Sequence, residues 1–297
     1  MKSVSCAIFL LISCLISNTV YAHAMVGDRV FPATLTIDDP GVSDELTLPQ
    51  VGRFNNAGPW TTTVTSEFDK TLTENWAISV NANWQSANGS SGFDNYDLGT
   101  KYVFLKNPEH ELMLSSELIW GIGDTGAKRI ADNFSTLTPS LLFGKGMGDL
   151  PDSLDYFKPF ALTGTLGLSV PTNRYSSDDM GSTLNPNILQ WGVTLQYSLP
   201  YLQQHVKDIG LSAPFNMAIP IVEFNLQTPT GTTPTGESRL TTGSINPGII
   251  FMGQEEQIGL EAQIPLNHES GNGIGFLIQT HFYLDNIFPT TIGRPLW

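Results

Sequence analysis

Apolar and polar side chains alternate with a period of two along most of this chain. The stretch 75–85 shows the pattern clearly. Its apolar parity begins at Trp76 and ends at Trp84, and its other parity carries asparagine, serine and glutamine. A period of two predicts a β-strand with one apolar and one polar face. One such strand is equally typical of a soluble β-sandwich and of a transmembrane barrel, so the other segments must decide.

The alternation recurs in further segments, most of them close to the length of about ten residues that a membrane-spanning strand needs. Two are weaker. The first contains Pro49, and segment 244–252 is apolar on both parities near its end. No segment with a helical period is comparably strong. The predicted strands are 44–54, 60–69, 75–85, 96–105, 111–120, 134–143, 160–170, 189–199, 217–227, 244–252, 257–266 and 274–284.

The connections between these segments tend to alternate in length. The long ones are rich in Gly, Ser, Thr, Asn and Asp: 86–93, 121–133, 171–184, 229–240 and 267–273. The short ones are 70–73, 106–109 and 253–255, while 144–155 and 200–214 are intermediate. Outer-membrane barrels have long outer loops and short periplasmic turns. This order requires an upward strand before residue 60, so the weak segment 44–54 is included and the count is even.

Composition supports this interpretation. Of the 297 residues, 40% are hydrophobic and only 14% are charged, with 28 Gly and 19 Pro, which suits strands and turns better than helices. After the N-terminal region, no segment is apolar for the roughly 20 residues that a spanning helix needs. A mature chain that meets a membrane must therefore cross it as a closed barrel. We predict an all-β fold, a transmembrane antiparallel β-barrel of about 12 strands, in the bacterial outer membrane.

The N-terminus has the features of a secretory signal peptide. Lys2 precedes an apolar core, and small residues favour cleavage after Ala22 or after Ala24. Both cysteines of the chain lie in this signal, so no disulfide or thiolate site is expected in the mature protein.

The predicted organisation has three parts: a signal peptide at 1–22, with cleavage after 24 as the alternative, an N-terminal segment at 23–43, and the barrel at 44–297. Segment 23–43 has no clear periodicity. It is either a loosely ordered leader or a partial plug folded into the lumen. His23 would become the mature N-terminal residue after cleavage at 22, where an amine and an imidazole can chelate copper. No second histidine cluster supports this, and we expect neither metal nor cofactor.

The net charge of the mature chain indicates which partners it can bind. Without Lys2 the mature chain has 13 basic and 28 acidic residues, a net charge of 13 − 28 = −15. An acidic chain without basic clusters argues against nucleic acid. The expected partners are outer-membrane lipid, the barrel-assembly machinery and a small-molecule solute.

The two parities define two sets of candidate residues. The polar parity would line the lumen, where its ionisable members either disfavour anions or simply fill the barrel through hydrogen bonds. These lumen candidates are Glu67, Asp97, Lys101, Glu117, Glu223, Glu261 and His281. Large aromatic residues near strand ends would form girdles at the membrane interfaces. The girdle candidates are Trp60, Trp76, Trp84, Trp120, Trp191 and Tyr197.

The run from Asn267 to Gly273 suggests an alternative chemistry. It faintly resembles the His-x-Ser-Asn-Gly run of outer-membrane phospholipases, which are twelve-stranded barrels, and it would make His268 the base and Ser270 the nucleophile. Here a Gly interrupts the run, and the run lies in the last loop instead of on a middle strand. A loop of turn-forming residues explains the run better, because a nucleophile, a base and a group that orients the base cannot be placed together.

Several short motifs resemble a known family. They are Thr36–Gly41 (TIDDPG), Asp97–Leu105 (DLGTKYVFL), Ile264–Asn267 (IPLN) and Phe282–Pro289 (FYLDNIFP). Together they resemble the transporter-like outer-membrane barrels grouped under the MetA pathway of phenol degradation. The resemblance implies a Gram-negative outer-membrane barrel that passes small organic molecules, and it supplies no catalytic residues. Either Phe282 or Trp297 could provide the terminal aromatic residue of the assembly signal.

These observations predict a porin-like channel or facilitator for passive passage of small molecules, not an enzyme. A phospholipase-like barrel hydrolase using His268 and Ser270 is one alternative. A secreted β-sandwich or surface binding protein is the other.

Overall fold

The computed structural model describes residues 24–55, 58–178, 181–231 and 239–297. The predicted signal peptide and His23 lie outside these ranges, so the cleavage site and the copper-chelating hypothesis stay predictions.

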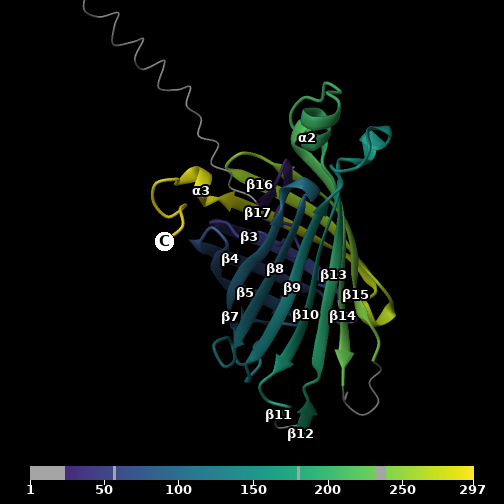
Figure 1. Ribbon diagram of the computed structural model, residues 1–297. Helices are drawn as coiled ribbons and strands as arrows, with labels where there is room; N and C mark the ends of the chain where they lie inside the picture. The colour runs from purple at the N-terminus through teal and green to yellow at the C-terminus, as the bar shows by residue number, and fades with distance from the viewer. Residues whose placement is uncertain (1–23, 56–57, 179–180, 232–238) are drawn as a thin grey trace, which may run out of the picture.

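Long antiparallel strands form a closed barrel (Figure 1). Within the described ranges there are twelve: β3 (Glu45–Asn55), β4 (Thr61–Thr73), β5 (Trp76–Ala87), β7 (Tyr96–Asn107), β8 (Leu112–Ile122), β9 (Thr136–Gly146), β10 (Phe160–Pro171), β13 (Asn187–Tyr197), β14 (Ala218–Thr230), β15 (Thr242–Met252), β16 (Glu256–Pro265) and β17 (Gly273–Tyr283). Each pairs with the next, and β17 pairs back onto β3. The predicted fold class is confirmed, and the closed ring excludes the β-sandwich alternative.

Every predicted strand is present, including the two weak ones. β3 continues through Pro49, and its pairings with β4 and β17 both shift register next to this residue, since proline has no N–H to give to the ladder. The strand containing residues 244–252 pairs on both sides, as its mixed parity allows.

Shorter elements decorate the barrel. The sequence pattern did not predict the hairpin of β1 (Ala24–Val26) with β2 (Arg29–Phe31), nor β6 (Ser90–Phe93), which turns back and pairs antiparallel with the end of β5. It also missed the hairpin of β11 (Tyr175–Asp178) with β12 (Gly181–Leu184), which stands at the end of the barrel that carries the long loops (Figure 1).

Short helical turns fill most connections at the opposite end. They are η1 (Pro108–His110), η2 (Asp152–Phe157), α2 (Leu199–Tyr201), η3 (Leu202–Val206) and η4 (Phe215–Met217). α3 (Leu284–Ile287) follows the last strand at this end, and η5 (His268–Ser270) belongs to a long loop. Because short connections are periplasmic in outer-membrane barrels, the end with α2 and α3 is the periplasmic one. Among the described residues no helix is long and apolar enough to cross a membrane, a finding that has no bearing on strands.

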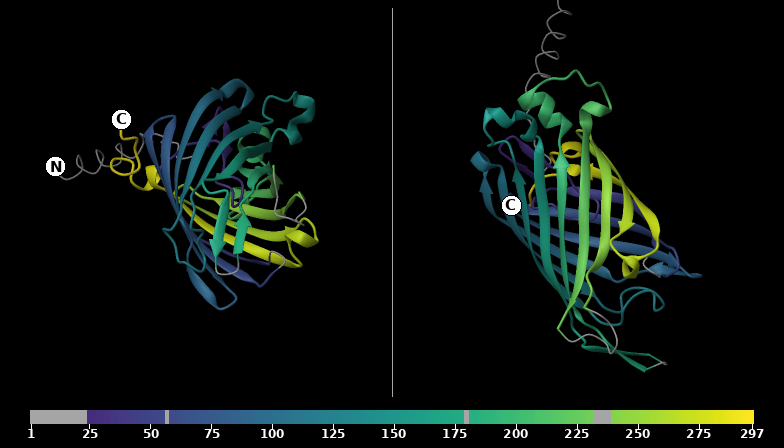
Figure 2. Two further views of the ribbon diagram at one scale, coloured as in Figure 1. Left: turned by 90° about the horizontal axis from the view of Figure 1, so that it is seen from below. Right: turned by 90° about the vertical axis from the view of Figure 1, so that its right-hand side faces the viewer.

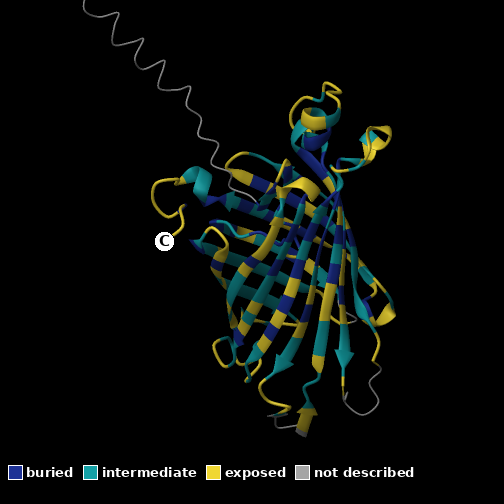
Figure 3. Ribbon diagram, in the orientation of Figure 1, coloured by how far each residue is buried: buried dark blue, intermediate teal, exposed yellow. Residues whose placement is uncertain are grey.

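Exposed residues alternate with more buried ones along the strands, as the bands of Figure 3 show, and many of the exposed residues are large and apolar. On β5, Trp76, Ile78 and Val80 are exposed, while Ala77 between them is buried. Such a surface is suited to hydrocarbon, because lipid tails replace water around it.

The girdle candidates lie on or next to this surface. Trp60, Trp76, Trp120 and Trp191 are exposed, and Trp84 and Tyr197 are partly covered. Two indole N–H groups find partners there. Trp76 Nε1 donates to Thr100 Oγ1 at 2.7 Å and Trp191 Nε1 to Thr228 Oγ1 at 3.2 Å. This matches the behaviour of Trp at membrane interfaces, where one end of the ring is apolar and the other polar.

Val80 and Asn81 provide a paired test of this orientation. Val80 is 45% exposed on the outer face, midway between two tryptophans, while Asn81 turns inward and donates to Glu67 at 3.5 Å. Val80→Arg is expected to destabilise the barrel by roughly 2–4 kcal/mol, the range for a cation near the bilayer midplane. Asn81→Arg adds the same cation beside an acid and should cost far less. Urea unfolding in lipid vesicles measures both, and equal losses would contradict the assignment of faces.

Candidate functional site: the lumen and the segment inside it

Residues 24–43 enter the barrel from its periplasmic end (Figure 2). The hairpin β1–β2 packs Ala24, Val26 and Phe31 against apolar side chains on the inner faces of β7, β8 and β10. Phe31 is only 1% exposed. Apolar side chains therefore line the lumen at its periplasmic end, and the N-terminal hairpin covers them.

A buried arginine fixes the hairpin. Arg29 is 1% exposed, and its Nε lies 3.0 Å from Glu111 Oε2. Its guanidinium also donates to the carbonyls of Pro159, at 3.2 Å, and Lys158, at 2.5 Å, and its Cζ lies 3.8 Å from the ring centroid of Tyr201. The guanidinium thus joins three periplasmic connections to the N-terminal hairpin, with its charge paired by a carboxylate and an aromatic face.

Tyr201 completes the arrangement. Burial, followed by the neighbouring Glu111 carboxylate, raises the pKa of Tyr201 to about 12, so the hydroxyl stays protonated. It donates to Glu111 Oε1 at 2.9 Å, and the amide of Gly148 donates to Oε2 at 2.9 Å. Each carboxylate oxygen of Glu111 is therefore engaged, which offsets part of the desolvation of this buried ion pair.

The following residues, 33–43, cross the lumen, and side chains of the barrel wall form hydrogen bonds with their backbone groups. Glu223 Oε2 accepts from Thr36 N at 2.8 Å, and its Oε1 accepts from Ile37 N at 3.3 Å. Other wall side chains donate to carbonyls of the segment. These are Gln50 to Leu35, Gln257 to Ala33, Ser115 to Pro40 and Lys101 to Asp39. The lumen wall thus satisfies peptide groups that have no strand partner.

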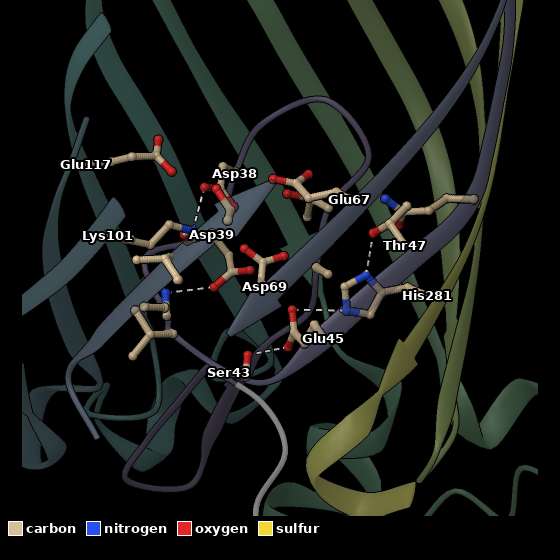
Figure 4. Close-up of a pocket in the computed structure, with 18 residues that line it drawn as sticks. Asp38, Asp39, Ser43, Glu45, Thr47, Glu67, Asp69, Lys101, Glu117 and His281 are labelled. Carbon is tan, nitrogen blue, oxygen red and sulfur yellow. Dashed lines mark hydrogen bonds and ion pairs between the residues drawn. The ribbon is translucent and has the colours of Figure 1, made fainter. Parts of the chain in front are cut away.

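Carboxylates gather where the segment meets the periplasmic half of the lumen (Figure 4). Six acids line this region: Asp38, Asp39, Glu45, Glu67, Asp69 and Glu117. Lys101 Nζ lies 2.5 Å from Asp38 Oδ2. His281 lies between Glu45, at 3.0 Å from its Nε2, and Thr47 Oγ1, at 2.8 Å from its Nδ1. With two basic side chains among six acids, this part of the lumen is electronegative.

A larger cavity of about 490 Å³ lies on the other side of Thr36, Ile37 and Asp38. It is bounded by strand ends that lead to the long loops. Its lining is mixed, with Gln190, Asn225, Gln227 and Gln263 beside Phe54, Ile119 and Leu226. Asp38 and Glu117 line both this cavity and the acidic region. The two spaces therefore meet at these carboxylates, with the N-terminal segment between them.

The lumen candidates from sequence occupy three kinds of position. Glu67, Lys101, Glu117 and His281 line the acidic region. Glu223 and Glu261 are buried in the wall, and Glu223 holds the segment. Asp97 is partly buried on β7 and lines neither space.

Sequence reasoning did not select Asp38, Asp39, Glu45 and Asp69 for the lumen, nor Arg29, Glu111 and Tyr201 for the anchor. The parity of Asp69 was available as a signal, since it is the same as that of Glu67.

The hydrolase alternative finds no support in the last loop. Ser270 Oγ donates to Asn267 Oδ1 at 2.7 Å and accepts from Gly243 N at 3.0 Å, whereas His268 is exposed. The hydroxyl thus stabilises the turn of η5, and among the described residues no base contacts it, as a serine nucleophile would require.

Comparisons with known proteins concern the fold. No family model and no curated protein sequence matches the chain, so the resemblance to MetA-pathway barrels rests on its short motifs alone. Among solved structures, the NanC porin matches with a TM-score of 0.50 at 9% identity, over 80% of this chain and 98% of that one. The KdgM porin gives 0.45 at 8% identity, over 80% and 98%. LpxR from Salmonella typhimurium gives 0.44 at 10%, over 80% and 99%.

The closed ring of twelve described strands, its apolar outer face and its polar interior define the class of this protein. It is a twelve-stranded antiparallel β-barrel of the bacterial outer membrane, with a fold similar to that of the NanC porin.

Arg29→Ala is expected to release the N-terminal hairpin, because Glu111 loses its cation while staying buried. Breaking a buried ion pair costs roughly 3–5 kcal/mol. Thermolysin, which cleaves on the N-terminal side of large apolar residues, should then cut the hairpin before Val30 in the detergent-solubilised barrel, while the wild type is protected. Arg129→Ala, at an exposed loop position, is the control and should leave protection unchanged. Equal protection of all three proteins would show that Arg29 does not hold the hairpin.

Proposed function

We propose that this protein is a passive outer-membrane channel or facilitator for small solutes, in which residues 24–43 form a plug. The observation that carries the proposal is the cavity of about 490 Å³ inside the closed barrel, which meets the acidic region at Asp38 and Glu117. A solute entering from the long-loop end would first occupy this cavity. Passage to the periplasmic end would then require residues 33–43 to move.

The lining indicates which solutes are favoured. Six carboxylates against Lys101 and His281 disfavour anions beyond the cavity, and the narrow interior strengthens that effect. The cavity itself combines amide side chains with Phe54, Ile119 and Leu226, which suits a small organic molecule carrying both apolar and hydrogen-bonding groups. The resemblance to MetA-pathway barrels points to the same class of solute.

The expected partners follow from this function: membrane lipid around the outer face, the barrel-assembly machinery during insertion, and the solute. No enzymatic step is proposed, since Ser270 and His268 are not joined.

Planar-bilayer recording of the signal-free chain tests the channel. In a KCl gradient the reversal potential is expected to show cations passing better than anions. A variant lacking residues 24–43 should conduct several-fold more, because the lumen is then clear. Glu117→Gln, at the meeting point of the two spaces, should weaken cation preference, while Glu269→Gln on the exposed loop should not. Absence of conductance in both the full and the shortened chain, with barrel folding confirmed by heat-modifiable gel migration, would refute a pore.

A further inference from the structure

A cluster of buried oxygen atoms lies on the inner faces of three neighbouring strands. Glu223 on β14 faces Asn246 on β15. The pairs Ile245–Ile264 and Gly248–Glu261 place Gln263 of β16 across from Asn246, with Glu261 two residues further along the same face. Glu223 and Asn246 are 0% exposed and Glu261 is 5% exposed.

Glu261 leans toward the other members of the cluster. A Cβ on Gly248 would lie 2.6 Å from Glu261 Cγ, so only glycine leaves room for this side chain to cross β15. Gly248 is therefore needed at this position, because it lets the Glu261 carboxylate approach Asn246 and Glu223.

Four oxygens in this cluster accept no hydrogen bond from the described residues. They are Glu261 Oε1, Glu261 Oε2, Asn246 Oδ1 and Gln263 Oε1. Buried acceptors without a donor are unfavourable and rare in folded proteins. The orientation of the Asn246 amide is fixed, since its Nδ2 donates to Thr36 Oγ1 at 3.2 Å.

No basic side chain of the described residues forms an ion pair with the cluster. None of the ion pairs among the described residues involves Glu223 or Glu261, and Lys101 pairs with Asp38. Glu223 accepts only from neutral donors: Thr36 N, Thr36 Oγ1, Ile37 N and Thr194 Oγ1. Two carboxyl groups thus lie together with two amide oxygens and no basic side chain, an arrangement that needs either a shared proton or a cation.

We propose that Glu261, Asn246 and Gln263, together with Glu223, bind one calcium ion. Calcium takes six to eight oxygen ligands, and it accepts carboxylates, side-chain amide oxygens and water in irregular geometry. Gln263 also lines the cavity of about 490 Å³, which gives the ion a route from the long-loop side and room for water ligands. The described residues contain no group of three His, Cys, Asp or Glu side chains suited to a metal, so the amide oxygens are what completes this site.

The site would couple calcium to the plug. Glu223 and Asn246 both contact Thr36, so an ion held between β14, β15 and β16 fixes the groups that hold the turn at residues 36–37. This inference is independent of solute passage, because it concerns binding and stability of the folded barrel.

Isothermal titration of the barrel with CaCl₂ tests the site. The protein is refolded in detergent without lipopolysaccharide and stripped with EDTA. The expected result is one saturable site per chain and a higher unfolding temperature with calcium. Glu261→Gln should weaken binding by roughly tenfold or more, since even groups outside the ligand shell contribute that much to metal affinity. Glu67→Gln removes a carboxylate from the separate acidic region and should retain the site.

Gln263→Glu provides a change in the opposite direction. A third carboxylate should tighten calcium binding and lower the unfolding temperature in EDTA, a gain that misfolding cannot produce. Equal calcium affinity in the wild type and Glu261→Gln, or no saturable binding by the folded wild type, would overturn the proposal. The latter result would assign a shared proton to Glu223 and Glu261.

Discussion

A strand in hydrocarbon has no water to bond its peptide groups, so every N–H and C=O at membrane depth must find a partner within the chain. This constraint explains why the first and last barrel strands, β3 and β17, pair with each other. It also explains why strand pairing is irregular beside Pro49, which has no N–H to donate. Register shifts appear in both neighbouring pairings, and Thr47 and His281 join β3 to β17 through side chains, 2.8 Å apart, beside the interruption.

The same constraint acts on residues 33–43, which cross the lumen without a strand partner. Here the side chains of the lumen wall make the hydrogen bonds that a neighbouring strand would otherwise make. Gln50, Gln257 and Ser115 donate to carbonyls, and Glu223 accepts from amides. A polar lumen was open to two interpretations from sequence, as a selective lining or as hydrogen-bonding filler. The structure separates the positions of these residues: Glu223 hydrogen-bonds the segment, whereas Glu67 and Glu117 line the acidic region.

Local periodicity was sufficient to predict the strands, because the alternation of apolar and polar residues is a property of each strand alone. Periodicity does not predict contacts between segments that are distant in the sequence. Arg29 meets Glu111 across 82 positions, and Lys101 lies beside Asp38 only because residues 33–43 turn back inside the ring. Asp97 shows that parity alone does not predict which polar residues line a cavity. It has the correct parity, yet its height along β7 takes it away from both spaces, and height depends on barrel shear, which no single strand encodes.

The way the N-terminal segment is tied restricts how the lumen can open. Arg29 holds the hairpin at one end. At the other end Asp44 lies 2.5 Å from Lys70 Nζ and accepts from Thr71 N at 2.8 Å. Between these anchors, the segment is held by contacts of both signs, with Lys101 on Asp38 and Glu223 on the amides of residues 36 and 37. Expelling the whole segment would break the buried Arg29 pair as well. For the proposed channel, a rearrangement confined to residues 33–43 is the less costly way to clear the lumen, because it leaves both anchors intact.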